Sequence, residues 1–167
     1  MRSFLLLTVI IFFSCSTSNQ KPFILKNPDA VQLKKEFLKS DSQLNTVLTY
    51  LERSYKATSE KTDIKTDPDF NNAECGFTKK FEFSIEYTLY KCGEAAPMKE
   101  TITFPKTSLE QLKKWIEDIH ASQTEEEVTN VWYKDKNEYG PKDEEVGCYY
   151  TIKQTEAQSI ISIWCGC

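Results

Sequence analysis

Residues 146–167 read VGCYYTIKQTEAQSIISIWCGC, and this stretch decides the fold because its two halves both have strand composition. β-branched and aromatic side chains dominate each half, and a polar turn joins them, which predicts an antiparallel hairpin. Pairing residues whose numbers sum to 313 puts Cys148 opposite Cys165, whereas a sum of 315 puts Cys148 opposite Cys167. Both registers predict a disulfide between Cys148 and one of these two cysteines.

The same hairpin predicts a cluster of aromatic side chains. In the 313 register, Tyr149 lies opposite Trp164 on the face away from the cysteines, and we expect Tyr90 on that outer side of the sheet. Such a cluster is a candidate surface for a partner or a sugar. The alternative is that the N-terminal helices cover these rings as part of the core.

Further strands precede the hairpin. From Phe77 onward, apolar and polar residues alternate as far as Leu89, which predicts one long strand flanked by Cys75 and Cys92. A straight strand would hold these two cysteines about 50 Å apart, so they pair only if a bulge or an earlier turn folds the segment back. Two more strands are predicted at 98–104 and 128–134, and polar loops at 58–73 and 135–145.

Helical periodicity appears in three places. Apolar residues recur at helical spacing after Asn27, again from Leu44 to Tyr55, and again from Leu109 to Ile119. The predicted N-terminal caps are Asn27, Ser40 and Thr107. We therefore predict an α+β fold in which N-terminal helices accompany an antiparallel sheet of about five strands, with one helix inserted between strands 2 and 3. Residues 28–167 are expected to form a single domain.

The first fifteen residues, MRSFLLLTVIIFFSC, have the layout of an export signal. One cation, Arg2, precedes an apolar run from Phe4 to Phe13. As a helix this run would be about 15 Å long, which is roughly half of a hydrocarbon core, so we do not expect it to span a membrane. Residues 1–14 are the predicted signal.

The end of this leader resembles bacterial lipoprotein signals, because a small residue, Ser14, precedes Cys15. The resemblance implies that Cys15 is acylated and becomes the new N-terminus, with 15–27 as a tether. It implies a bacterial cell-envelope protein held to the membrane by lipid, and the lack of an acidic sorting residue in Ser16-Thr17-Ser18 after Cys15 favours a periplasm-facing position. Two alternatives are ordinary cleavage after Ser16, which would release a soluble secreted protein, and an uncleaved buried segment.

Charge and cysteine content restrict the partners. The chain carries a formal charge of −4, and removing Arg2 with the leader makes this −5. Lysines occur only as scattered pairs, so we expect no nucleic-acid partner. A cationic protein partner is easier to accommodate, and the acidic candidates for contacting it are Asp143, Glu144 and Glu145. Export favours disulfides over a metal cluster, and five cysteines remain besides Cys15.

Catalytic motifs are not evident in the sequence. The single histidine, His120, falls in the last turn of a predicted helix, where it suits the helix dipole, and no G-x-S-x-G motif occurs. We predict no cofactor and no metal site. The favoured function is a membrane-tethered binding protein of the envelope without catalytic activity. The more specific hypothesis is an inhibitor or immunity-type protein for an exported toxin or hydrolase. The alternatives are a small envelope hydrolase that uses carboxylates and a structural lipoprotein.

Overall fold

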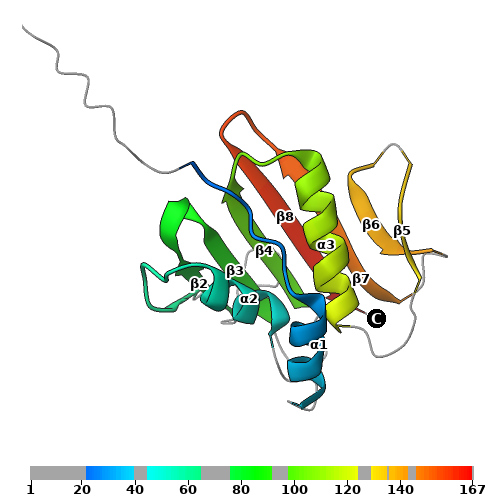
Figure 1. The fold of residues 1–167 in the computed structure, drawn as a ribbon, viewed down its shortest axis with the longest axis horizontal. Helices are drawn as coiled ribbons and strands as arrows, with labels where there is room; N and C mark the ends of the chain where they lie inside the picture. Colours follow the sequence, from blue (N-terminus) through cyan, green and yellow to red (C-terminus); the bar gives the residue numbers. More distant parts are fainter. Residues whose placement is uncertain are drawn as a thin grey trace, which may run out of the picture.

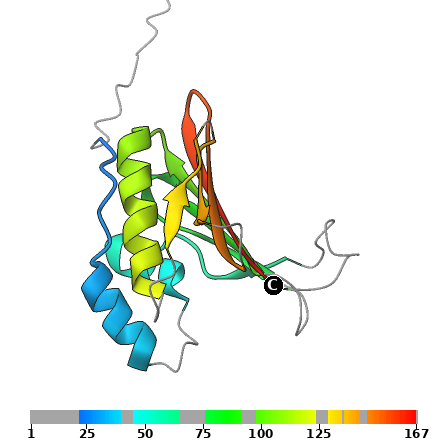
Figure 2. The same ribbon diagram turned by 90° about the vertical axis from the view of Figure 1, so that its right-hand side faces the viewer.

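An antiparallel sheet of eight strands, counted over the residues that the structure describes, carries its helices on one face (Figures 1 and 2). The computed structural model describes residues 22–39, 45–64, 76–91, 98–123, 129–134, 136–142 and 146–166. The helices are α1 (Ala30–Lys39), α2 (Thr46–Ser54) and α3 (Leu109–Gln123). The strands are β1 (Thr62–Asp63), β2 (Gly76–Lys80), β3 (Glu86–Lys91), β4 (Met98–Pro105), β5 (Asn130–Trp132), β6 (Glu138–Pro141), β7 (Gly147–Gln154) and β8 (Gln158–Gly166). The predicted α+β class is confirmed.

Two meanders meet in the middle of this sheet. The spatial order is β1-β2-β3-β4-β8-β7-β6-β5, so each meander follows chain order and the two join where β4 pairs with β8. Helix α3 connects the meanders by carrying the chain from central β4 to edge strand β5 (Figure 1). The predicted site of the inserted helix, between strands at 98–104 and 128–134, is therefore correct.

The core lies between α3 and the inner face of the central strands. Four apolar side chains of α3 are fully buried, namely Leu112, Trp115, Ile116 and Ile119. They face buried residues of β4, β7 and β8, which include Ile102, Phe104, Tyr150, Ile161 and Ile163. Helix α2 adds Val47, Leu48 and Leu51, and its Tyr50 meets Trp115 edge to face with ring centroids 5.6 Å apart. Burial of this many large apolar side chains on one face stabilises the layered arrangement.

The helices start later than the predicted caps. In α1, the Asp29 carboxylate accepts a hydrogen bond from the backbone N–H of Gln32 at 2.9 Å. In α2, the Asn45 side chain accepts from the backbone N–H of Leu48 at 2.7 Å. In α3, the Ser108 hydroxyl accepts from the backbone N–H of Gln111 at 3.3 Å. Each helix is capped by a short polar side chain, as helix N-termini favour, but the capping residues Asp29, Asn45 and Ser108 lie one to five residues after the predicted ones.

The expected count of about five strands is wrong, and the sheet has eight. Strand β1 lies in the stretch 58–73, which was predicted as a polar loop. Strand β6 lies in the predicted loop 135–145, and the prediction failed there because Gly140 and Pro141 are typical turn residues, although both belong to this strand. The third difference is that the predicted long strand is a hairpin, β2 and β3. Inward-facing residues have odd numbers on both strands of this hairpin, as the paired residues Phe77 and Leu89 show. The alternation of apolar and polar residues therefore continues through the turn between Phe81 and Ile85 without a break, as it would in one straight strand.

The turn of this hairpin places two ordinary residues in the left-handed region. Phe83 has φ 60° and Ser84 has φ 59°, and the pair forms the centre of the tight turn Glu82–Ile85. Such turns favour Asn-Gly, since a side chain in this conformation meets its own backbone. Phe83 is nevertheless aromatic and 40% exposed, and it packs against Phe23 with ring centroids 5.7 Å apart.

We expect the double substitution Phe83→Asn with Ser84→Gly to raise the free energy of unfolding by about 1 kcal/mol, because it relieves the backbone cost at both positions. Urea denaturation of the purified protein measures this change. The matched control is Phe83→Ala, which removes the same contact with Phe23 but keeps a Cβ in the left-handed conformation. A double variant no more stable than Phe83→Ala would contradict the assigned cause.

Candidate functional site

The face of the sheet opposite the helices carries the candidate site. Figure 2 shows α1, α2 and α3 on one side of the sheet, so the helices do not cover the other side. Register places Tyr149 opposite Trp164, Trp164 opposite Lys99 and Lys99 opposite Tyr90, which sets all four side chains on the helix-free face. We call these four residues the aromatic row. Trp164 is 42% exposed.

Contacts within the aromatic row join its members in pairs. The ring centroids of Tyr149 and Trp164 are 6.1 Å apart, with their planes 46° apart. At the other end, the ammonium of Lys99 lies 5.7 Å from the centroid of the Tyr90 ring, which is a cation–π distance. Tyr149 also lies against the backbone of Gly140, where an added Cβ would be 2.6 Å from Cδ1 of the tyrosine. The row is therefore positioned by its neighbours rather than free to rotate.

A second row, of hydroxyl side chains, runs beside the first. Six adjacent strands, in the spatial order β1-β2-β3-β4-β8-β7, contribute one residue each. We call these residues the hydroxyl row, and they are Thr62, Thr78, Thr88, Thr101, Ser162 and Thr151. The Oγ1 atoms of Thr78 and Thr88 are 3.2 Å apart. Each hydroxyl on the four strands shared with the aromatic row is two residues from an aromatic-row member, so the rows lie about 7 Å apart.

The Cys148–Cys165 disulfide lies directly behind the aromatic pair. It links β7 to β8 in the 313 register, with the two Cα atoms 4.1 Å apart, and both cysteines pack against the core. The alternative pairing of Cys148 with Cys167 is therefore not the one observed. Because Tyr149 and Trp164 follow and precede these cysteines by one residue, the disulfide fixes the two strands at the point where the rings meet.

Several residues predicted from the sequence cannot be placed. The lipidation site and three disulfide candidates, Cys15, Cys75, Cys92 and Cys167, lie outside the described residues, as do the acidic candidates Asp143, Glu144 and Glu145. The two cysteines Cys75 and Cys92 were expected to lie far apart because one straight strand was predicted between them, and the structure shows a hairpin there instead. The segment between them folds back, and Gly76, which follows Cys75, pairs directly with Tyr90, which lies two residues before Cys92.

We therefore predict a second disulfide between Cys75 and Cys92, which leaves Cys167 as the unpaired thiol. Peptide mapping of the unreduced protein should recover the peptides containing Cys75 and Cys92 as one linked species. The linked peptides of Cys148 and Cys165 in the same digest are the positive control. Recovery of Cys75 or Cys92 as an alkylated thiol without prior reduction would contradict the prediction.

His120 belongs to the core. It is 8% exposed in the last turn of α3 and lies edge-on to Tyr139 and Tyr150, with ring centroids 5.5 and 5.8 Å away. Its Nδ1 is 3.5 Å from the side-chain nitrogen of Asn130. Within the described ranges, no three His, Cys, Asp or Glu side chains gather closely enough to hold a metal ion. The packing gives His120 a structural role beneath β6 and β7.

Glu100 is a buried carboxyl that the sequence interpretation missed. It is 1% exposed on the inner face of β4, and it accepts a hydrogen bond from the Tyr87 hydroxyl at 2.7 Å. That hydroxyl in turn accepts from the side chain of Asn45, which caps α2. Burial raises the pKa of Glu100 to about 7, and the hydrogen bonds from Tyr87 and Asn45 lower it in part. The signal was available, because Glu100 has the same parity as the inward-facing Ile102.

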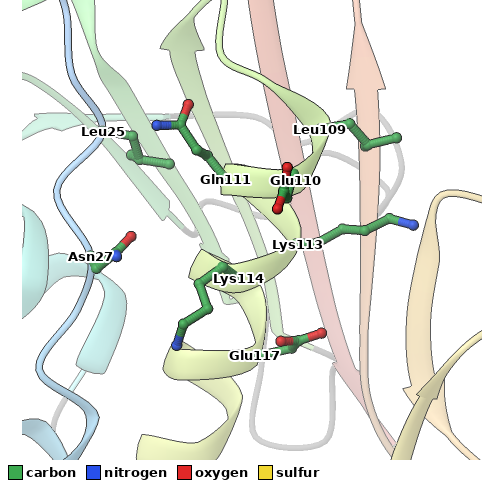
Figure 3. A pocket seen from close by; sticks show the side chains of 8 residues that line it. All are labelled: Leu25, Asn27, Leu109, Glu110, Gln111, Lys113, Lys114 and Glu117. Atoms are coloured by element: carbon green, nitrogen blue, oxygen red, sulfur yellow. The ribbon is translucent and has the colours of Figure 1, made fainter.

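A surface hollow lies on the helix side of the molecule (Figure 3). It measures about 740 Å³, between the extended N-terminal segment and α3, and its lining includes Leu25, Glu110 and Lys114. Figure 3 shows Lys113 and Lys114 extending to opposite sides of the helix. Lys113 lies over the Trp132 ring at 4.7 Å, and the Trp132 N–H donates to Glu117 at 2.8 Å. Several charged groups here are thus engaged with neighbours on the helix surface, and the hollow is remote from the aromatic row.

Comparison of the chain with protein-family models, with curated proteins and with solved structures found no match. The function is therefore argued from the residues and their geometry alone.

Proposed function

We propose that this chain is a membrane-tethered binding protein of the bacterial cell envelope, without catalytic activity, whose ligand docks on the aromatic row. The observation that carries the proposal is the row of Tyr90, Lys99, Trp164 and Tyr149 on the face that the helices leave uncovered, where Trp164 is exposed and the other three side chains are half-buried. Aromatic side chains that are clustered and accessible are the usual anchors of binding surfaces, because they bury a large area at low entropic cost.

Rigidity supports the same proposal. The aromatic row stands on four paired strands, the disulfide fixes two of them, and Gly140 leaves room for the ring of Tyr149. A surface that is already ordered loses little conformational entropy when a ligand docks. A site of this kind can bind with useful affinity without the enclosed cleft that catalysis usually needs.

The membrane tether in this proposal rests on the leader alone. None of the helices in the described part of the chain is long and apolar enough to cross a membrane. We expect the intact mass of the mature protein to show an acylated Cys15 at the N-terminus. A mass that begins at unmodified Thr17 would instead make this a soluble secreted protein.

The inhibitor or immunity-type role for a toxin or hydrolase remains a more specific form of the proposal. It depends on a cationic protein partner for Asp143, Glu144 and Glu145, which lie outside the described residues. On the helix-free face, the charge within the aromatic row is the positive Lys99. The helix-free face therefore favours a ligand that does not need acidic side chains of this protein for its binding.

Site-specific photocrosslinking in the native envelope tests the proposed docking face. A photoreactive amino acid in place of Trp164 should give a discrete adduct, because that side chain is exposed at the centre of the row. The matched control replaces Lys114, which is exposed on α3 across the molecule. Equal adducts from both positions, or no adduct from Trp164, would overturn the proposal.

A further inference from the structure

The chemistry of the helix-free face narrows the class of ligand, if the proposed docking face is right. We infer that the aromatic row and the hydroxyl row together bind an extended glycan chain. Pyranose rings present C–H groups on their faces, which stack on Trp164 and Tyr149, and hydroxyls at their edges, which exchange hydrogen bonds with the hydroxyl row.

The balance of charge on the two rows fits an uncharged or weakly charged ligand. Lys99 is the one charged member of the rows as defined, and Glu138, opposite Thr151, adds one charge of the other sign at the end of the hydroxyl row. Charges gather one row further along the strands, where Lys80 lies 3.5 Å from Glu86. A chain of phosphates would need several cations on the rows themselves.

Hydrogen-bonding capacity favours a glycan over a protein surface. Every member of the hydroxyl row can both donate and accept, which matches the hydroxyls of a sugar. The centres of protein interfaces are instead enriched in arginine and methionine and depleted in serine, and the two rows contain neither arginine nor methionine. The aromatic rings alone would suit either partner, so the hydroxyl row decides between them.

The length of the rows favours a chain over a single sugar. Adjacent strands are about 4.8 Å apart, so six strands extend the hydroxyl row to about 24 Å. The aromatic row runs beside the last four of these six strands, from Tyr90 on β3 to Tyr149 on β7. Several consecutive sugar units can therefore contact both rows at once, and these weak contacts add together.

Titration calorimetry of the full chain with chitohexaose, cellohexaose and maltohexaose tests the inference. We expect at least one of the three to bind with a dissociation constant of about 1 mM or lower. Trp164→Ala should weaken that binding about tenfold or more, and the pair Thr101→Val with Ser162→Ala several-fold. The matched control is Phe83→Ala, because Phe83 is an aromatic residue of similar exposure, 40% against 42%, and lies outside both rows.

The possible outcomes separate this inference from the proposed function. Binding that Trp164→Ala abolishes and Phe83→Ala retains supports both. If none of the three hexasaccharides binds while the photocrosslinker at Trp164 captures a protein, the glycan is wrong and the docking face stands. Glycan binding that survives Trp164→Ala would overturn the inference, because the sugar would then bind elsewhere.

Discussion

Glu100→Gln should stabilise the protein by about 3 kcal/mol near pH 8 and by little near pH 4. The wild-type carboxyl is buried between β4 and the helices, where ionisation is costly, and its pKa is raised from 4.5 to about 7. Glutamine has nearly the same shape, still accepts the hydrogen bond from Tyr87, and never ionises. The variant thus removes a cost that wild type bears only when Glu100 is charged.

The gain in stability appears at high pH because the pKa of Glu100 is raised in the folded protein. Because the folded-state pKa of Glu100 lies above its unfolded value, the neutral carboxyl favours folding below about pH 4.5, and this contribution is lost as the pH rises through about 7. Tyr87 and Tyr150 face the same carboxyl, and burial raises the pKa of both phenols, so they stay neutral over this range. The stability gain of the variant should therefore grow between these two pH values and then level off.

Urea denaturation of wild type and variant across this pH range measures the effect. Glu110→Gln is the matched control, since Glu110 is an exposed glutamate in the first turn of α3 and should show no comparable gain at high pH. A gain of equal size at both ends of the range would show that packing, rather than ionisation of Glu100, is responsible.

The second large effect concerns the disulfide behind the aromatic pair. Replacing Cys148 and Cys165 together by alanine should lower the free energy of unfolding by about 3 kcal/mol. A disulfide that closes a loop of about 15 residues typically stabilises by this amount, because it limits the conformations of the unfolded chain. The sequence separation is 17 residues. The hairpin remains paired by its backbone hydrogen bonds, so the variant should fold with the same secondary structure at low denaturant.

Thermal or urea unfolding of the unreduced proteins measures this loss, with circular dichroism as the check on folding. The matched control is Cys167→Ala, which removes a cysteine next to the same strand and should leave stability unchanged if that thiol is unpaired. A large loss from Cys167→Ala, or none from the double variant, would contradict the assignment.

Local patterns predicted the elements of this fold better than their number. The final hairpin was predictable because strand composition, a polar turn and two cysteines all agree on one register. The β2–β3 hairpin was not, because Phe81 and Ile85 keep the alternation in phase through a turn that lacks glycine and asparagine. A turn with unfavourable residues leaves no local signal.

The candidate site shows the same division. Opposition of Tyr149 and Trp164 needs only the hairpin register, which the sequence contains. Membership of Lys99 and Tyr90 in that row depends on β4 pairing with β8, which are separated by α3 and three strands along the chain. The hydroxyl row could be recognised only when the registers of all six strands were known. Threonine is common on exposed strands, so its presence in the sequence does not by itself indicate that these residues line up.

The meeting of β4 and β8 at the centre of the sheet also sets the order in which the molecule can assemble. Among the strands that the structure describes, β8 comes last in sequence, yet it supplies the neighbour of β4. During synthesis, which starts at the N-terminus, β4 has an unpaired edge until β8 emerges, and Ile102 and Phe104 lack the core side chains of β8, such as Ile161. The sheet is therefore complete only after β8 has emerged, and a chain arrested before β8 should be a substrate for chaperones or proteases rather than a partly working domain.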